Sequence, residues 1–115
     1  MKLIQIYECF CDETRLRILN LLALMPLCVS DLQKALQLNQ VKMSKHLHYL
    51  KERGMVNVVR AKNKRIYSLT KNGCAELDYN MRCLQDCSRE YPIFKEDLRR
   101  LEALLNQPAK TKERL

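Results

Sequence analysis

The sequence lacks the features of a membrane or exported protein. No apolar run approaches the roughly 20 residues needed to cross a bilayer. The amino-terminal residues also lack the charged, apolar and cleavage regions, in that order, of a signal peptide. No internal repeat or low-complexity segment is present. These absences exclude a membrane-spanning protein and predict a cytoplasmic protein with no membrane partner.

Histidine is scarce, and its positions argue against thiol catalysis. The chain has six cysteines but only two histidines, His46 and His48, which lie two residues apart. A catalytic cysteine usually needs a histidine base beside it, and no cysteine here stands in such a recognisable context. Without an export signal, structural disulfides are not expected. We therefore predict no enzymatic activity, and cysteines that stay reduced and bind or react.

Acidic residues are outnumbered, 13 against 21 basic ones, which gives a formal net charge of +8. Such an excess indicates a polyanionic partner, and nucleic acid is the first candidate. The length of 115 residues suits one domain with a modest core. We place that domain at residues 1–107 and expect residues 108–115, which begin with Pro108, to be a frayed basic tail.

The apolar pattern predicts a mainly α-helical fold with a two-stranded β-wing, the winged helix-turn-helix. Apolar residues recur at helical spacing in the first ten residues, and Asp12 offers an N-cap to a buried second helix. Ser30 or Asp31 offers an N-cap to the short third helix.

In the fourth helix we expect Val41 to face inward with Leu47 and Leu50, and Gly54 supplies a left-handed stop after it. A hairpin follows, in whose turn Asn63 tolerates a positive φ. A long helix comes next, which Pro92 breaks or kinks, and the apolar stripe continues beyond it. The expected ranges are helices 1–10, 13–24, 30–38 and 40–53, strands 56–60 and 65–69, and helical segments 71–90 and 92–105.

Basic residues concentrate between Gln40 and Arg65, a segment that contains eight of them and a single acidic residue, Glu52. Two short helices joined by a tight turn place the second helix in the major groove of DNA, where its first residues reach base edges. A basic hairpin tip holds phosphates or enters the minor groove. The predicted DNA-binding residues are Gln40, Lys42, Met43, Ser44, Lys45, His46, His48 and Tyr49 on the helix, and Arg60, Lys62, Lys64 and Arg65 on the wing.

Two alternatives compete with DNA binding by this segment. A basic helix is often only a solvated face, but then the charge segregation, the short preceding helix and the basic hairpin would coincide by accident. His46 and His48 are also potential zinc ligands. Their side chains diverge at a spacing of two on a helix, which disfavours a shared ion.

Cys83 and Cys87 form the best paired-ligand pattern among the thiols. Four residues apart on a predicted helix, they lie on one face and can share a soft ion. The alternative is that they act as small apolar residues in a dimer-forming helix. Cys11 precedes a helix whose positive end favours a thiolate, so it is a candidate reactive thiol. Cys9 is a further candidate, which lies beside Cys11 if the chain unwinds there and points elsewhere if the first helix is regular. Cys28 is another, with a lone buried thiol as the alternative.

The chain resembles the ArsR/SmtB family of metal-sensing repressors, of the arsenic-responsive type, over roughly residues 5–75. The resemblance is carried by Asp12-Glu13-Thr14-Arg15-Leu16-Arg17-Ile18-Leu19, by Ser44-Lys45-His46-Leu47 with Leu50, Gly54, Met55 and Val56, and by Tyr67-Ser68-Leu69. It implies a homodimer joined through its first and last helices. It also implies repression by occupying double-stranded operator DNA until an effector releases the protein.

The effector sites of that family are only partly matched. Arsenite sensors can carry Cys-Val-Cys-Asp-Leu, whereas this chain has Cys28-Val29-Ser30-Asp31-Leu32 and keeps one thiol. The Asp-x-His pair of zinc sensors is replaced by Asp78-Tyr79-Asn80.

We expect no constitutive cofactor, and a regulatory site for arsenite or antimonite built from Cys83 and Cys87 with a third thiolate from Cys9 or Cys11. The alternative is a dithiol redox or persulfide sensor on the same scaffold. A protein-interaction module that uses the last helix is a third class, which would not need salt-sensitive DNA affinity.

Overall fold

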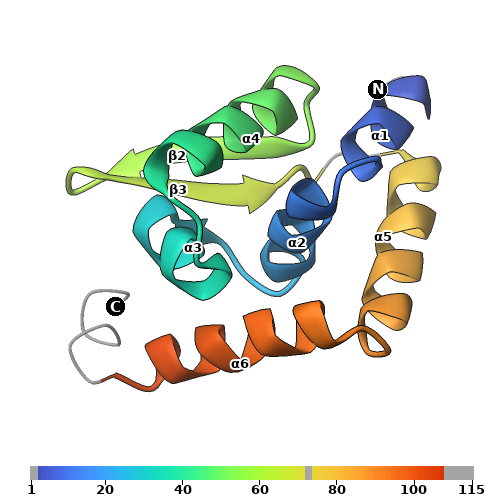
Figure 1. Cartoon of the computed structure of the whole chain (residues 1–115). Helices are drawn as coiled ribbons and strands as arrows, with labels where there is room; N and C mark the ends of the chain where they lie inside the picture. The colour runs from blue at the N-terminus through green and yellow to red at the C-terminus, as the bar shows by residue number, and fades with distance from the viewer. Residues whose placement is uncertain (1–2, 72–73, 108–115) are drawn as a thin grey trace.

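The computed structural model describes residues 3–71 and 74–107. Within these ranges it confirms a mainly helical winged helix-turn-helix (Figure 1). The predicted tail, 108–115, lies outside the described residues. No helix in the described ranges is long and apolar enough to cross a membrane. The elements are α1 (Leu3–Phe10), α2 (Glu13–Leu22), β1 (Leu27–Cys28), α3 (Val29–Leu36), α4 (Gln40–Glu52), β2 (Val56–Ala61), β3 (Lys64–Leu69), α5 (Ala75–Ser88) and α6 (Pro92–Leu105).

Short polar side chains set where the helices begin. The Asp12 carboxylate accepts a hydrogen bond of 3.0 Å from the backbone N–H of Arg15, as predicted for the cap of α2. Asn39 caps α4 in the same way, with 2.8 Å to the N–H of Lys42. Between them, α3 begins after Cys28 and has no side-chain cap, so the predicted cap at Ser30 or Asp31 is wrong. The left-handed residue Gln37, at φ 55°, ends α3 and forms the tight turn into α4.

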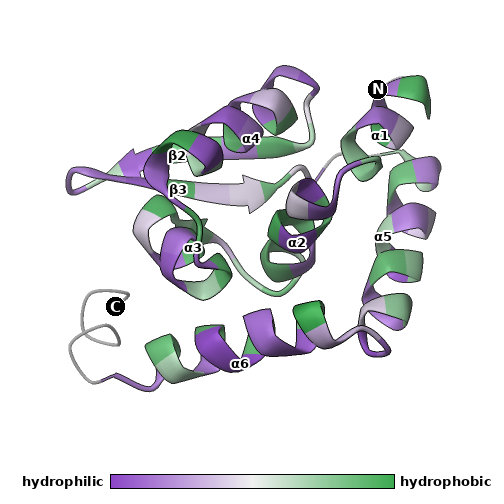
Figure 2. Ribbon diagram, in the orientation of Figure 1, coloured by the Kyte–Doolittle hydropathy of each residue, from purple (hydrophilic) through white to green (hydrophobic). Residues whose placement is uncertain are grey.

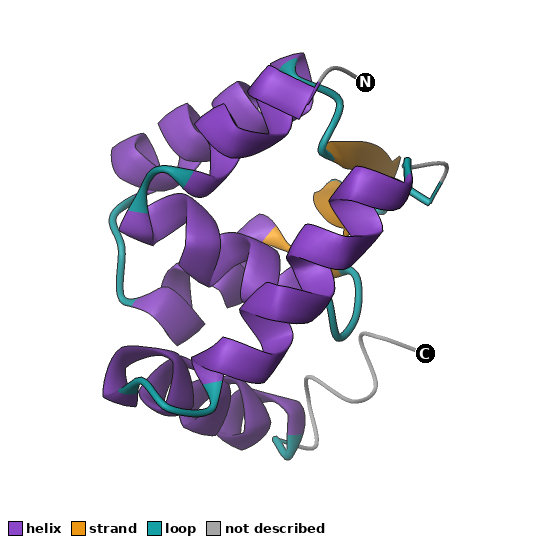
Figure 3. Ribbon diagram, turned by 90° about the vertical axis from the view of Figure 1, so that its right-hand side faces the viewer, coloured by secondary structure: helices purple, strands orange, loops and turns teal. Residues whose placement is uncertain are grey.

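Strands β2 and β3 form the predicted hairpin, and their connection is two residues long. Lys62 and Asn63 have φ of 50° and 65°, which is the backbone shape that lets a two-residue turn join twisted strands. Gly54, at φ 74°, supplies the expected left-handed exit from α4. The sheet also has a third strand that the sequence did not predict, because β1 is only two residues long and pairs with β3 at Leu27↔Tyr67. Seen from the side of α5, helices make up most of the molecule around this small sheet (Figure 3).

Residues 75–105 form two helices, so Pro92 breaks the predicted long helix and does not merely kink it. Helix α5 ends at Ser88, and Pro92 begins α6, where its missing N–H costs no helical hydrogen bond. The two helices cover different parts of the molecule (Figure 1): α5 packs against α1 and α2, and α6 packs along α2 and α3. The apolar stripe predicted to continue through both helices therefore serves two separate contacts.

A buried ionic network fixes α6 to the helix-turn-helix. The Asp97 side chain has no exposed surface and accepts hydrogen bonds from Arg17 of α2, at 2.8 and 2.9 Å, and from Arg100 at 2.8 Å. The same guanidiniums donate to the last carbonyls of α3, Arg17 to Leu36 at 2.9 Å and Arg100 to Ala35 at 2.5 Å. These bonds satisfy carbonyls that the helix end leaves unpaired. They join three helices at one point.

Candidate DNA-binding face and cysteine cavity

The outer face of α4 is defined by the residues that face the core. Met43, Leu47 and Leu50 are almost completely buried. Helical geometry therefore directs Val41, Lys45 and His48 outward, in a row along the opposite side. The expectation that Val41 faces inward is wrong, because its side chain is 79% exposed.

Three of the residues predicted to contact DNA point elsewhere. Met43 is fully buried, so its predicted contact with base edges is wrong. His46 is half-buried, with its Nδ1 3.8 Å from an oxygen of Asp12. The ring of Tyr49 lies between two guanidiniums, 4.0 Å from that of Arg15 and 3.4 Å from that of Arg53. His46 and Tyr49 thus connect α4 to its neighbours in the protein.

Burial lowers the pKa of His46 below its usual value, and the nearby Asp12 carboxylate only partly opposes this effect. The imidazole is consequently neutral at pH 7, and its contact with Asp12 is not a full ion pair. His48, in contrast, is exposed and lies 3.2 Å from Glu52 one turn along the helix. Of the two histidines, only His48 faces outward.

The wing adds positive charge beside the start of α4. Arg60 and Arg65 lie directly opposite each other in the hairpin register, an arrangement that destabilises an isolated sheet because like charges meet. A hollow of about 530 Å³ separates the wing from α3 and α4. It is lined by Gln40, Arg60, Lys62, Lys64 and Arg65 together with Cys28, Val29, Ser30, Gln33 and Asn63. A phosphate backbone fits the charge of such a hollow.

Hydrophilic residues dominate the hairpin tip and much of α4, whereas apolar residues are frequent along α1 and α5 (Figure 2). The exposed large apolar side chains of these two helices are Leu3, Ile4 and Tyr7 on α1 and Tyr79 on α5. The charged face and this apolar face occupy different sides of the molecule. They suit two different partners.

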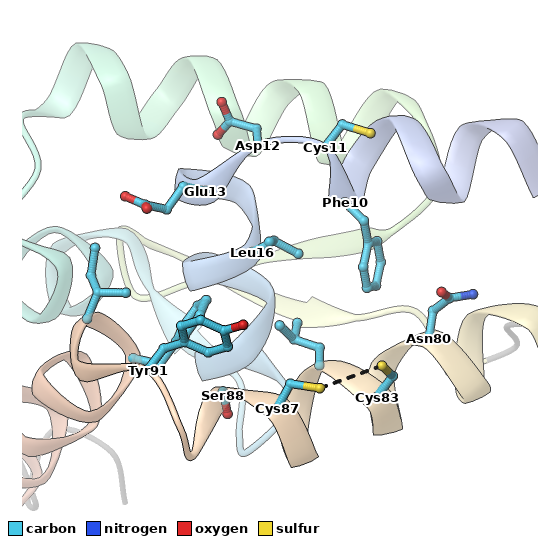
Figure 4. A pocket seen from close by; sticks show the side chains of 13 residues that line it. Phe10, Cys11, Asp12, Glu13, Leu16, Asn80, Cys83, Cys87, Ser88 and Tyr91 are labelled. Carbon is cyan, nitrogen blue, oxygen red and sulfur yellow. Dashed lines mark hydrogen bonds between the residues drawn. The ribbon is translucent and has the colours of Figure 1, made fainter.

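A second cavity, of about 490 Å³, brings together three of the predicted effector ligands. Cys83 and Cys87 of α5 line it, as does Cys11 from the α1–α2 junction. The Cys83 and Cys87 sulfurs are 3.9 Å apart, and Figure 4 shows Cys11 on the opposite wall, apart from the pair. The hydrogen bond with Cys83 raises the pKa of Cys87 above its usual value, so the pair keeps a proton more firmly than a lone thiol.

The other two candidate thiols lie elsewhere. Cys9 is fully buried in the core, where burial raises the pKa of its thiol. It is not among the residues that line the cavity, so the structure does not support it as a third ligand. Cys28 lines the basic hollow beside the wing, with its sulfur 3.2 Å from the hydroxyl of Ser30. In the described residues no three His, Cys, Asp or Glu side chains are close enough together to hold a metal ion.

The Cys83–Cys87 pair by itself fits a soft ion. With metal–sulfur bonds of about 2.3 Å and tetrahedral angles, two thiolates lie about 3.8 Å apart, close to the 3.9 Å observed. Both thiols are exposed, so an ion can reach them. The donor set in this arrangement is two sulfurs, with Cys11 available only if the cavity closes.

No sequence pattern predicts the rest of the cavity lining. Its walls are mostly apolar and come from the end of α1, the start of α2, α5 and the start of α6. The apolar residues are Phe10, Leu16, Leu84, Tyr91, Ile93 and Phe94. Helical spacing assigns these residues to the apolar sides of separate helices. They line one cavity only because the helices pack together in the folded chain.

A tight-turned helix pair, a basic hairpin wing and an outward-facing basic helix define the winged helix-turn-helix class of regulators. Residues 12–58 match the family model described as bacterial regulatory protein, arsR family. Over these residues the chain is therefore similar to a family of bacterial transcription regulators.

Two curated relatives match part of the chain. The arsenical resistance operon repressor of Escherichia coli (strain K12) is 48% identical over 54 residues, 46% of each chain. The arsenic resistance transcriptional regulator ArsR1 of Pseudomonas putida (strain KT2440) is 42% identical over 52 residues, 44% of this chain and 41% of that protein. The chain thus spans less than half the length of these relatives. The family model itself ends at residue 58, before Cys83 and Cys87.

Among solved structures, HlyU from Vibrio cholerae N16961 is similar over more of the chain. Its TM-score is 0.66 at 27% identity, covering 73% of this chain and 88% of that one. A structure of reduced HlyU from the same organism has the same TM-score and identity, and 85% of it is covered.

Proposed function

We propose that this protein is a dimeric repressor that binds operator DNA through α4 and the wing, and that a thiophilic effector, arsenite or antimonite, releases it by binding Cys83 and Cys87. The observation that carries the effector assignment is the pair of exposed thiols 3.9 Å apart in a cavity that also contains Cys11. The arsenic-related names of both curated relatives support the same ligand class.

Operator binding is supported by the charge of one face. The outward side chains of Gln40, Lys42 and Lys45 lie on the first turns of α4, where helix-turn-helix proteins contact base edges. Ser44 is half-buried beside them and suits a phosphate contact. The opposed Arg60 and Arg65 of the wing repel each other until a polyanion neutralises them.

Dimerisation is supported by the apolar face of α1 and α5. The last helix, α6, is occupied within the chain by α2 and α3. We therefore place the dimer contact on α1 and α5, and not on α6. A dimer presents two α4 helices to two half-sites about one turn of DNA apart.

The cavity can act on α4 through the α1–α2 junction. Cys11 directly precedes Asp12, which caps α2 and contacts His46 of α4. A ligand that draws Cys11 toward Cys83 and Cys87 moves this junction, and with it the support of α4. Release then requires that the ligand binds the DNA-free conformation more tightly than the DNA-bound one.

The test uses fluorescence anisotropy of the protein's own promoter DNA with fully reduced protein. Arsenite, antimonite, cadmium and zinc are titrated separately. Trivalent metalloids should release the wild type but not the Cys83→Ser/Cys87→Ser variant, which should bind DNA as tightly as the wild type because neither residue lies near α4. Cys74→Ser, a half-buried thiol outside the cavity, is the matched control and should respond normally. A fully responsive double variant would overturn this site.

A dithiol redox or persulfide sensor is the second candidate. Its specific support is that the Cys83 and Cys87 sulfurs are 3.9 Å apart, because a disulfide needs two thiols in mutual reach. Oxidation of the pair would release two protons and two electrons to an oxidant. Release by a disulfide oxidant or organic persulfide alone, reversed by a reductant, would favour this function over metalloid sensing.

A further inference from the structure

Val41 is the most exposed large apolar side chain in the described part of the chain, at 79%. It lies on the first turn of α4, on the side opposite Met43 and Leu47. The other exposed apolar side chains of helices gather on α1 and α5, whereas the neighbours of Val41 are Gln40 and Lys42. An apolar side chain is thus presented at the centre of the polar face that we assign to DNA.

The chemistry of the DNA major groove supplies a partner for such a side chain. Base edges in that groove present hydrogen-bond donors and acceptors, and one apolar group, the C5-methyl of thymine. Gln40, the residue before Val41, lines the basic hollow between the wing and α4. A duplex whose backbone lies in that hollow therefore has its base edges next to the first turn of α4.

We propose that Val41 is a specificity residue that reads one thymine in each operator half-site, by packing its γ-methyl groups against the thymine C5-methyl. The proposal rests on the proposed operator binding and adds a base preference to it. Val41 makes no phosphate contact. Lys45, one turn further along the same side of α4, and the wing supply the charge-dependent part of binding.

The experiment first selects a preferred duplex from a random-sequence library with the full-length wild-type protein. Each thymine of that duplex is then replaced in turn by deoxyuridine, which removes only the C5-methyl group. Dissociation constants are measured by anisotropy at several salt concentrations. At one thymine per half-site the replacement should weaken wild-type binding about fourfold, as expected for the loss of one buried methyl group.

Three variants separate the methyl contact from a general weakening of binding. Val41→Ala should bind the thymine duplex more weakly and should no longer distinguish thymine from deoxyuridine at that position. Its salt dependence should match that of the wild type, because the valine side chain touches no phosphate. Val41→Thr keeps a branched side chain with one methyl group and should retain part of the discrimination. Leu24→Ala, an exposed apolar residue that follows α2, should behave as the wild type.

The outcomes separate the role of Val41 from operator binding itself. If the wild type binds the selected duplex but deoxyuridine has no effect at any position, or has the same effect on Val41→Ala as on the wild type, the role of Val41 is overturned and operator binding stands. If the wild type prefers no duplex over random DNA, sequence-specific operator binding fails, and the thymine preference fails with it.

Discussion

His46 shows how one residue can resemble a DNA ligand in sequence and serve another purpose in the fold. It lies in the predicted DNA-reading helix, but its imidazole is half-buried and close to Asp12. Burial, with smaller contributions from the positive charges of Arg15, Lys45 and Lys42, lowers its pKa, and Asp12 raises it less than burial lowers it. His46 therefore links folding stability to pH near neutrality.

The sign of this link follows from the lowered pKa. Above the ordinary histidine pKa of about 6.5 the group is neutral in both the folded and unfolded states. As the pH falls below that value, the unfolded state takes up the proton first, so the free energy of unfolding decreases until the folded-state pKa is passed. The stability contributed by neutral His46 is thus present above about pH 6.5 and diminishes below it.

His46→Gln should remove this part of the pH dependence. Urea unfolding of the wild type and the variant, from slightly alkaline to mildly acidic pH, should show a smaller decrease in stability for the variant. Ser44→Ala, a half-buried residue of the same helix that does not titrate, is the control and should keep the wild-type pH profile. Identical pH profiles for His46→Gln and the wild type would contradict the role of burial at this residue.

At the scale of elements, the Asp97 network predicts where the chain is most sensitive to removal of a charge. Asp97→Asn leaves two guanidiniums, of Arg17 and Arg100, without a buried counter-charge. Breaking a buried pair in this way typically destabilises a protein by about 3 kcal/mol or more. Urea unfolding should show a large decrease in the midpoint.

The neighbouring Glu96 offers a matched control on the same helix. Its carboxylate pairs with Arg99, where both side chains are largely exposed, and lies 3.5 Å from Arg100. Glu96→Gln should lower the unfolding midpoint far less than Asp97→Asn, because Arg100 keeps its buried partner Asp97 and water replaces an exposed ion pair at little cost. If both variants unfolded at the wild-type midpoint, the attachment of α6 to α3 would not depend on Asp97.

The wing predicts opposite effects on folding and on DNA binding. Arg65→Gln removes one of two like charges that face each other across β2 and β3, so the DNA-free protein should melt at the same temperature or higher. Its affinity for the selected duplex should fall, and the slope of log Kd against log salt should decrease by about one for each phosphate that the shortened, neutral side chain no longer neutralises. An unchanged slope would show that Arg65 is not at a phosphate.

How far the sequence predicts these elements depends on the range of the interactions involved. Caps and turns are local, so the predictions for Asp12, Gly54 and the hairpin turn at Asn63 are confirmed. The pairing of β1 with β3 joins residues about forty positions apart through only two residues, and no pattern of that length is recognisable. The inward position expected for Val41 is wrong because Met43 and Leu47 define the buried side of α4, and Val41 lies on the opposite side.

The cysteine cavity is predictable in part for the same reason. A spacing of four residues on one helix suffices to place Cys83 beside Cys87. Cys11 joins them only because α5 packs against α1 and α2, far from it in the sequence. Cys9, two residues from Cys11, points into the core, since α1 remains a regular helix through Phe10.

For the whole molecule, the apolar face on α1 and α5 has no partner within the described chain. Helices α1 and α5 also line the cysteine cavity. A dimer contact on these helices would therefore link a change in the cavity to the distance between the two α4 helices of the dimer. The second copy would also link two weak half-site contacts into one strong interaction, because the second contact becomes intramolecular.

Ile4→Glu tests this arrangement, because Ile4 is 65% exposed on α1 and its replacement should not disturb the core. In sedimentation experiments the wild type should behave as a dimer of the 13.6 kDa chain, and the variant as a monomer with an unchanged helical circular dichroism spectrum. Its affinity for a two-half-site duplex should fall by about 100-fold or more, while its affinity for a single half-site should equal that of a wild-type protomer. Leu24→Glu, equally polar but away from α1 and α5, should remain dimeric. A dimeric Ile4→Glu variant with wild-type affinity would place the contact on another surface and would separate the cysteine cavity from the dimer contact.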